Sequence, residues 1–171
     1  MSSLKKELII IGILFAWAIT ASMVAMIYYS EYNYMYQKYV EERSTTIVVD
    51  IGINYGNGTL VWYNNTKLLK GMSVYDALLI VADTVNSTTS PFGVYVRGIN
   101  GVNENANDSW IYAINRNDSD VNAWFAINGW YYPGASCDRL ALKEGDSVVW
   151  LFYNWRAYFP PPDPTTNNNV R

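Results

Sequence analysis

The hydrophobic pattern of the chain changes sharply near residue 30. Between Leu8 and Tyr29 apolar residues run without a charge, and at about 1.5 Å per residue this stretch spans roughly 33 Å, enough to cross the hydrocarbon core of a bilayer. A secretory signal peptide is the alternative, but its apolar region is about 7–15 residues long and ends in a small-x-small site, which this stretch does not offer cleanly. The pattern predicts a retained signal anchor over 8–29, with a short tip at 1–7.

The charges that flank this stretch predict its orientation. Lys5 and Lys6 stand before it, whereas the other flank opens with Glu31 and meets its first cation at Lys38. The positive-inside rule therefore predicts a cytoplasmic N-terminus, with the rest of the chain outside the cell membrane.

Tyrosines follow the apolar stretch at helical spacing, with polar residues between them. This pattern predicts that the anchor continues as a stalk helix over 30–44. Two interpretations of its tyrosine face stay open: an aromatic belt at the membrane interface, or a contact surface for a partner helix or for the protein's own domain. The face consists of Tyr28, Tyr32, Tyr36 and Tyr39.

From residue 45 onward the pattern is that of a mixed α+β domain. Partial alternation on both sides of Asn57-Gly58 predicts a β-hairpin. Ser73 and Asp76 match a capping box that opens a helix of three to four turns over 73–85. Further strands are expected at 92–99, 109–115, 122–128 and 147–155, with 109–115 and 122–128 paired. This order predicts a sheet with one helix across one face.

Five segments in this order resemble a known family. They are GMSVYDALL, FGVYVRGINGV, the run from Trp124 to Gly129, GAS at 134–136 and LALKEGDSVVWLFY. Together they resemble the transcobalamin-like C-terminal domain, a β-grasp-like module of prokaryotic surface proteins. The resemblance covers roughly residues 45–154 and implies a β-grasp-like domain over 45–155, followed by a Pro/Asn-rich tail over 156–171.

The resemblance also suggests a corrinoid as a ligand. In the vertebrate corrinoid carriers the similar domain closes over one face of cobalamin, and a separate α-helical barrel supplies the other half of the site. No segment of these 171 residues resembles that barrel. The resemblance therefore implies the fold more firmly than the ligand, and no other cofactor is expected.

Composition and charge then exclude several classes of function. A net charge of −3 without a basic run lacks the electrostatic footprint of a nucleic-acid-binding protein. The chain has no histidine, the commonest general base and zinc ligand. Asp118 and Asp120 fall in an expected open turn, and the Asn/Asp-rich segments do not fit a calcium loop. We therefore expect no catalytic residues and no metal site.

Aromatic residues are the remaining candidates for function, because the chain carries 15 Tyr and 7 Trp. Alternate residues of a strand face opposite sides, so only part of these rings can reach a core covered by one helix. Exposed Trp and Tyr favour an interface, and three consecutive rings follow the Asn128-Gly129 turn. The predicted ligand- or partner-binding residues are Trp110, Trp124, Trp130, Tyr131 and Tyr132.

N-x-S/T sequons lie only on the predicted outer side of the membrane, where a glycan would be a solubilising surface group. The candidate acceptors are Asn57, Asn64, Asn86, Asn107 and Asn117.

The leading hypothesis from the sequence is a membrane-anchored, non-enzymatic module that assembles with itself or with other envelope proteins, as a subunit of a complex or filament. The alternative is capture of a small ligand such as a corrinoid, or of a carbohydrate, at the cell surface.

Overall fold

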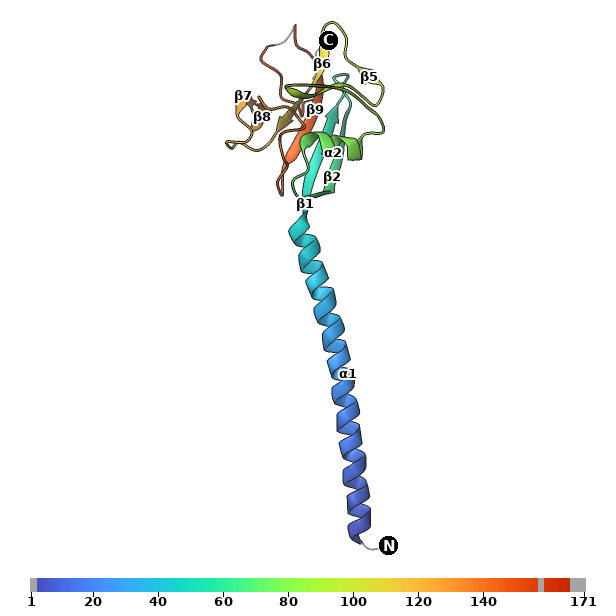
Figure 1. Cartoon of the computed structure of the whole chain (residues 1–171). Coiled ribbons are helices and arrows are strands. Elements are labelled where there is room, and N and C mark those ends of the chain that lie inside the picture. The colour runs from blue at the N-terminus through green and yellow to red at the C-terminus, as the bar shows by residue number, and fades with distance from the viewer. Residues whose placement is uncertain (1–2, 157–158, 167–171) are drawn as a thin grey trace. The chain divides into compact units, whose positions relative to one another are not determined.

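The computed structural model describes residues 3–156 and 159–166, and it divides into two units, Met1–Thr45 and Thr46–Arg171 (Figure 1). The first unit is a single helix, α1 (Ser3–Thr45). The second unit contains the helix α2 and two β-sheets, which confirms the predicted α+β class.

Helix α1 is continuous through the apolar stretch and the tyrosine segment. Its stretch Glu7–Lys38 is long and apolar enough to cross a membrane, by length and composition. The hydroxyls of Thr20 and Ser22 donate to the carbonyls of Ala16 and Ala18, over 3.1 Å and 2.8 Å. These polar groups are therefore satisfied inside the helix, as an apolar surrounding requires.

A six-stranded sheet forms the frame of the second unit, with the strand order β2-β1-β9-β6-β8-β7. Strands β1 and β9 run parallel, and the other neighbours are antiparallel. The predicted hairpin at Asn57-Gly58 is confirmed as β1 paired with β2. The strands are β1 (Thr46–Asn54), β2 (Leu60–Leu69), β6 (Asp108–Ile114), β7 (Ala123–Ile127), β8 (Trp130–Pro133) and β9 (Ser147–Asn154).

Helix α2 (Val74–Val81) begins with the predicted capping box and is shorter than predicted. The Ser73 hydroxyl accepts from the Asp76 amide, and the Asp76 carboxylate accepts from the Ser73 amide over 2.8 Å. The helix ends at Ala82, whose backbone is extended, and the chain enters β3 (Val85–Ser90). The prediction of a helix to residue 85 was wrong because Val85 is the first residue of a strand that favours β-branched residues.

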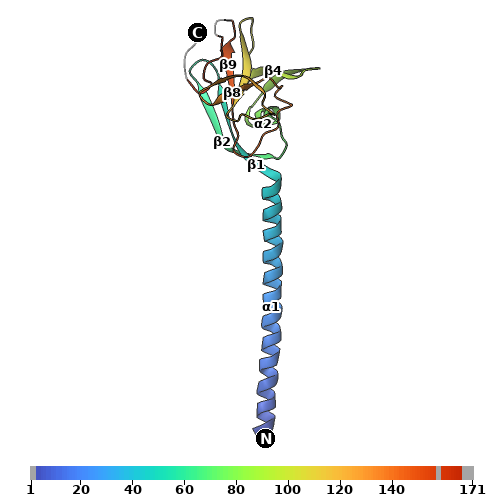
Figure 2. The same cartoon turned by 90° about the vertical axis from the view of Figure 1, so that its left-hand side faces the viewer.

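A second, three-stranded sheet consists of β3, β4 (Gly93–Ile99) and β5 (Val102–Asn103) in that order. Figure 2 shows β4 running across the direction of β8 and β9. Strand β4 was predicted from the sequence, and β3 was not.

The predicted pairing of 109–115 with 122–128 was wrong. Strand β7 pairs instead with β8, for which no strand was predicted from the sequence. Asn128 and Gly129 take φ values of +50° and +83°, which suit a two-residue hairpin turn and give β7 the nearest segment as its partner. Strand β6 pairs along its length with β9, which lies far away in the sequence.

The core lies between one face of the large sheet, helix α2 and the small sheet. Alternate residues of β1, Ile47, Val49, Ile51 and Ile53, are buried there against Val74 and Leu78 of α2 and against Trp110, Tyr112 and Trp150 of β6 and β9.

The C-terminal segment 159–166, named the strap here, packs back on the domain. Its Pro161 and Pro164 are buried. The Tyr132 hydroxyl donates to the carbonyl of Pro162 over 2.6 Å, and the Asn54 amide donates to that of Pro164 over 2.8 Å. The described part of the predicted Pro/Asn-rich tail therefore lies on the domain. Tyr158 lies outside the described residues.

We predict that Asn54→Ala destabilises the domain by about 1–3 kcal/mol, because it leaves the Gly56 amide and the Pro164 carbonyl without their partner. Denaturation of the full chain in detergent measures this. The control, Lys67→Ala on the exposed face of β2, should change stability by less than about 0.5 kcal/mol. Equal effects of the two substitutions would contradict a role for the Asn54 bonds in holding the strap.

Candidate functional site

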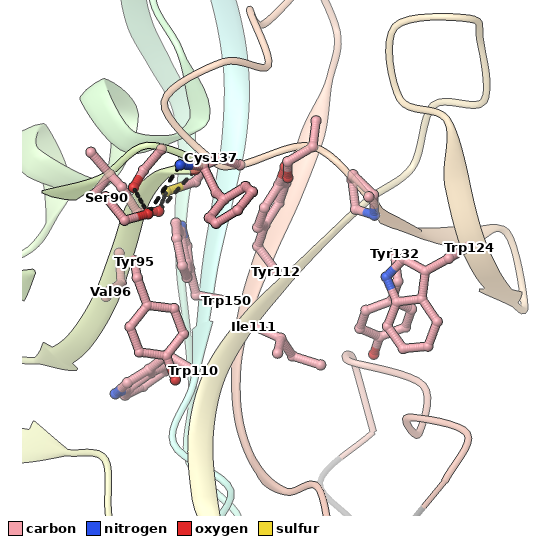
Figure 3. A pocket seen from close by; sticks show the side chains of 17 residues that line it. Ser90, Tyr95, Val96, Trp110, Ile111, Tyr112, Trp124, Tyr132, Cys137 and Trp150 are labelled. Carbon is pink, nitrogen blue, oxygen red and sulfur yellow. Dashed lines mark hydrogen bonds between the residues drawn. The ribbon is translucent and has the colours of Figure 1, made fainter. Parts of the chain in front are cut away.

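A pocket of about 340 Å³ lies between the two sheets of the second unit (Figure 3). Its walls come from β4 and the preceding turn, from β6, from β7 and β8, and from β9. The lining residues are Ser90, Phe92, Gly93, Val94, Tyr95, Val96, Trp110, Ile111, Tyr112, Trp124, Tyr132, Pro133, Gly134, Ala135, Ser136, Cys137 and Trp150.

The pocket exists because the large sheet splits between β6 and β8. Strand β6 pairs with β9 from Asp108 to Ile114, but it pairs with β8 only at Ile114↔Tyr131. Strand β8 then ends at Pro133, which has no amide hydrogen to continue a ladder. The two strands diverge, and Figure 3 shows Ile111 of β6 pointing into the space on the side of Tyr132 and Trp124.

Three buried rings form the floor of the pocket: Trp110 and Tyr112 of β6 and Trp150 of β9. The rings of Tyr112 and Trp150 lie 5.4 Å apart, tilted by 40°. The Trp110 indole donates to the carbonyl of Val102 over 2.9 Å, and the Tyr112 hydroxyl donates to that of Ala135 over 2.7 Å. Burial raises the Tyr112 pKa, so this hydroxyl stays neutral. The floor is therefore aromatic, and hydrogen bonds hold two of its three rings in place.

Trp124 stands at the rim because of a β-bulge. The register of β7 against β8 shifts between Ala123↔Pro133 and Phe125↔Tyr132, so Trp124 is the extra residue. A bulge redirects a side chain, and here both Trp124 and Phe125 contact Tyr132, with ring centroids 6.2 Å and 6.0 Å away. The strict alternation expected at this position therefore fails. Trp124 is half exposed and stacks on Phe159 of the strap over 5.9 Å.

A closed hydrogen-bond network forms one end of the pocket. The Val94 amide donates to the Asp138 carboxylate over 2.9 Å, and the Ser136 hydroxyl lies 2.9 Å from the Val94 carbonyl and 2.5 Å from the same carboxylate. Gly93 has φ +119°, and a Cβ there would lie 2.3 Å from the Ser136 hydroxyl, so the close approach requires glycine. This network ties β4 to the 134–138 loop.

The pocket is uncharged. None of its lining residues, all from the described part of the chain, is acidic or basic. Cys137 is buried, and burial together with the nearby Asp138 charge raises the pKa of its thiol to about 12. The thiol is therefore neutral at physiological pH and poorly placed for an intermolecular disulfide bridge.

The structure brings three of the five sequence-predicted binding residues to the pocket: Trp110, Trp124 and Tyr132. The other two lie elsewhere. Tyr131 packs against the core, and Trp130 lies 6.4 Å from Trp62 of β2. Tyr131 thus separates from its two neighbours, because neighbouring strand residues face opposite sides.

Sequence reasoning missed most of the other walls. Tyr112 and Trp150 were recognisable as strand aromatics, but nothing local in the sequence places them together with Val94 and Ser136. The pocket is a product of pairings between strands that are distant in sequence.

The other candidate groups are spread over the surface. All five sequon asparagines are exposed, and none lines the pocket. In the tyrosine face of α1, Tyr28, Tyr32 and Tyr36 are exposed, and the Tyr39 side chain lies outside what the structure describes.

The Asp118 and Asp120 pair is held in ion pairs with Lys143, at 2.7 Å and 2.8 Å, and both also face Arg116. The Lys143 hydrogen bond, with that of Arg116, holds the Asp118 pKa well below its usual range. Within residues 3–156 and 159–166 no group of three or more His, Cys, Asp or Glu is arranged to hold a metal ion.

No family model and no curated protein matches the chain. Two solved structures are similar in part. A "putative metal binding protein" from Ruminococcus gnavus ATCC 29149 has 10% identity and a TM-score of 0.48, and the match covers 63% of this chain and 97% of that one. Haptocorrin in complex with Cbi has 14% identity and a TM-score of 0.46, and the match covers 64% of this chain and 26% of that one. At these TM-scores neither likeness defines a fold family or a ligand.

The network at the end of the pocket predicts a pH dependence. Hydrogen bonds from Ser136 and from the Val94 amide lower the Asp138 pKa, so its folded pKa lies below the unfolded value of about 3.9. The stabilisation is then fully present above about pH 4 and is lost as the pH falls through the folded pKa.

Asp138→Asn should therefore melt at a lower temperature than the wild type at neutral pH, and the gap should narrow below about pH 4. Melting curves of the full chain between about pH 3 and pH 7 measure it. The exposed Asp83→Asn variant controls for the loss of one negative charge, and a gap for Asp138→Asn that stays constant down to about pH 3 would refute the assignment.

Proposed function

We propose that this chain is a single-pass, membrane-anchored binding module and not an enzyme, with its pocket as the binding site. In this proposal α1 crosses the cell membrane with the N-terminus in the cytoplasm, and residues 46–166 lie outside. The apolar length of α1 and the flanking Lys5 and Lys6 support this arrangement.

The observation that carries the binding role is the pocket itself: a concave, aromatic, uncharged space of about 340 Å³. Binding sites for small molecules are mostly apolar clefts of about 300–1,000 Å³ with a few placed polar groups. The pocket lies at the small end of this range, so it suits a ligand of one or two rings. A corrinoid would have to lie across the pocket mouth instead of entering it.

The β-grasp-like arrangement and the kinship with the transcobalamin-like C-terminal domain remain part of this proposal. What supports them is the arrangement of one capped helix, α2, beside a mixed sheet, together with the five quoted sequence segments. Glycosylation of the five exposed sequons on the outer side is proposed with the same topology.

The binding role predicts that small uncharged aromatic probes raise the melting temperature of the full chain in detergent. Naphthalene, quinoline and indole near their dissociation constants should each raise it by about 1–3 °C. Ile111→Trp should abolish the shift, because the larger ring fills the space on the Tyr132 side of the pocket.

Two comparisons make this test specific. Leu69→Trp, at an exposed position of β2 outside the pocket, should leave the shift intact. If Ile111→Trp does not fold, Trp124→Ala serves in its place and should weaken the shift by removing one rim ring. Shifts that survive both pocket substitutions would refute the role of the pocket, and a shift with cobalamin alone would favour the corrinoid alternative.

A second function, assembly through α1, is favoured by a separate observation. The rings of Tyr32 and Tyr36 stack at 6.3 Å on one face of the helix, and the two residues are 67% and 52% exposed. Exposed tyrosines bury a large area at low cost in entropy when a partner covers them. We propose that this face contacts a second copy of the chain or another envelope protein.

Cysteine cross-linking tests self-assembly through this face. Tyr32→Cys or Tyr36→Cys should give disulfide-linked dimers of the full chain in membranes, whereas Tyr34→Cys, turned about 200° from position 32, should not. The native Cys137 is buried and adds little background. Equal cross-linking at all three positions would contradict a defined face, and no cross-linking at any of them would exclude self-assembly there.

A further inference from the structure

The floor of the pocket holds a hydrogen-bond donor without a partner. The indole Nε1 of Trp150 is buried, and among the described residues it has no hydrogen-bond acceptor. Trp150 is only 2% exposed and lines the pocket. In Figure 3 its nitrogen points toward the end of the pocket marked by Cys137.

An unpaired buried donor is unfavourable, because burial removes its hydrogen bonds to water and nothing replaces them. A phenylalanine at position 150 would also give an aromatic floor, without burying an unpaired donor. The unpaired donor therefore indicates that an acceptor binds inside the pocket.

The other polar side chains of the buried walls are already used. Tyr112 and Trp110 donate to backbone carbonyls, as described above, and Tyr132 donates to the strap. The Ser90 hydroxyl donates to the Gly93 carbonyl over 3.1 Å, and the Cys137 thiol lies 3.4 Å from the Val94 carbonyl. The Tyr95 hydroxyl interacts with the side chains of Glu104 and Ser109.

Because these polar groups already have partners, the pocket offers a ligand few hydrogen bonds, and this restricts which ligands fit. A carbohydrate needs many hydrogen bonds, which these walls do not offer, and an ion would find no opposite charge. A flat ring system would pack on Trp110, Tyr112 and Trp150 and gain stacking contacts. We infer that the pocket binds a small, uncharged aromatic molecule carrying one hydrogen-bond acceptor, which takes the N–H of Trp150.

The inference rests on the proposed function and is tested separately from it. Quinoline and naphthalene have nearly the same shape and differ in a ring nitrogen that accepts a hydrogen bond. Both are uncharged at neutral pH. For the full chain in detergent micelles, quinoline should bind about 5- to 10-fold more tightly than naphthalene relative to their partition into empty micelles, because one buried hydrogen bond contributes about 1 kcal/mol or more.

Nuclear magnetic resonance of the indole N–H groups gives the direct readout. The Trp150 signal, identified by its loss in Trp150→Phe, should shift downfield with quinoline and much less with naphthalene. Trp150→Phe should lose the preference for quinoline, so that the ratio of the two affinities falls to that of their partition into empty micelles. Trp110→Phe is the matched control: its N–H already bonds the Val102 carbonyl, so the preference should remain.

The outcomes distinguish a failure of the pocket's binding role from a failure of Trp150 as the hydrogen-bond donor. If neither probe binds, the proposed binding role of the pocket fails, and the inference fails with it. If both bind equally in the wild type, or if the preference persists in Trp150→Phe, the pocket remains a binding site, but the assignment of Trp150 as the donor is overturned. If Trp150→Phe does not fold, the indole signals of the wild type still decide, because bound quinoline that moves none of them downfield refutes the hydrogen bond.

Discussion

Strand β6 has two edges, and the pairing of each edge determines the shape of the domain. One edge is used in full by β9, with register pairs from Asp108 to Ile114. The other edge is joined to β8 only at Ile114. Since a ladder continued along this edge would close the sheet, the single pairing at Ile114 is what leaves room for a pocket between β6, β8 and the small sheet.

The strap is held in part by β8, the strand on the other side of the gap that opens beside β6. Tyr132 follows the Ile114↔Tyr131 pair, and its hydroxyl reaches the Pro162 carbonyl. Burial raises the Tyr132 pKa, so the hydroxyl keeps the proton that it donates. Asn54 and Asn128 hold the same segment through Pro164 and Asp163, over 2.8 Å and 3.0 Å. The strap therefore covers a sheet surface that would otherwise expose the rings of β7 and β8, and its Phe159 rests on Trp124 at the pocket rim.

The features that the sequence predicted correctly are local ones. The β1–β2 hairpin follows from a turn between alternating segments, and the start of α2 follows from the capping box at Ser73 and Asp76, because each of these is decided by residues close in sequence. The partner of β6 could not be read in this way, since β9 begins some thirty residues after β6 ends. Local rules also hid the bulge at Trp124, which the sequence treated as an ordinary strand position.

The candidate site shows the same division between local and long-range information. Alternation implied that only part of the aromatic rings could reach the core. The rings of residues 130–132 were nevertheless predicted together as binding residues, whereas Tyr131 packs on the core and Tyr132 lines the pocket. Alternation could not tell which ring would meet the pocket, because that depends on where the sheet splits. The polar end was invisible for the same reason, since Val94 and Asp138 meet only after β4 folds against the 134–138 loop.

The indole of Trp150 and the exposed tyrosines of α1 differ in how their polar groups are satisfied. A tyrosine on the helix surface keeps its hydroxyl in water or at the membrane interface. Its hydroxyl therefore has no desolvation cost when no partner is bound. The Trp150 donor is not hydrated in this way, because it is buried and has no acceptor among the described residues. Its unfavourable burial is relieved only when an acceptor, from water or from a ligand, occupies the pocket. An occupant able to accept that hydrogen bond thus gains more than one that merely fills the space, so the site selects by chemistry as well as by size.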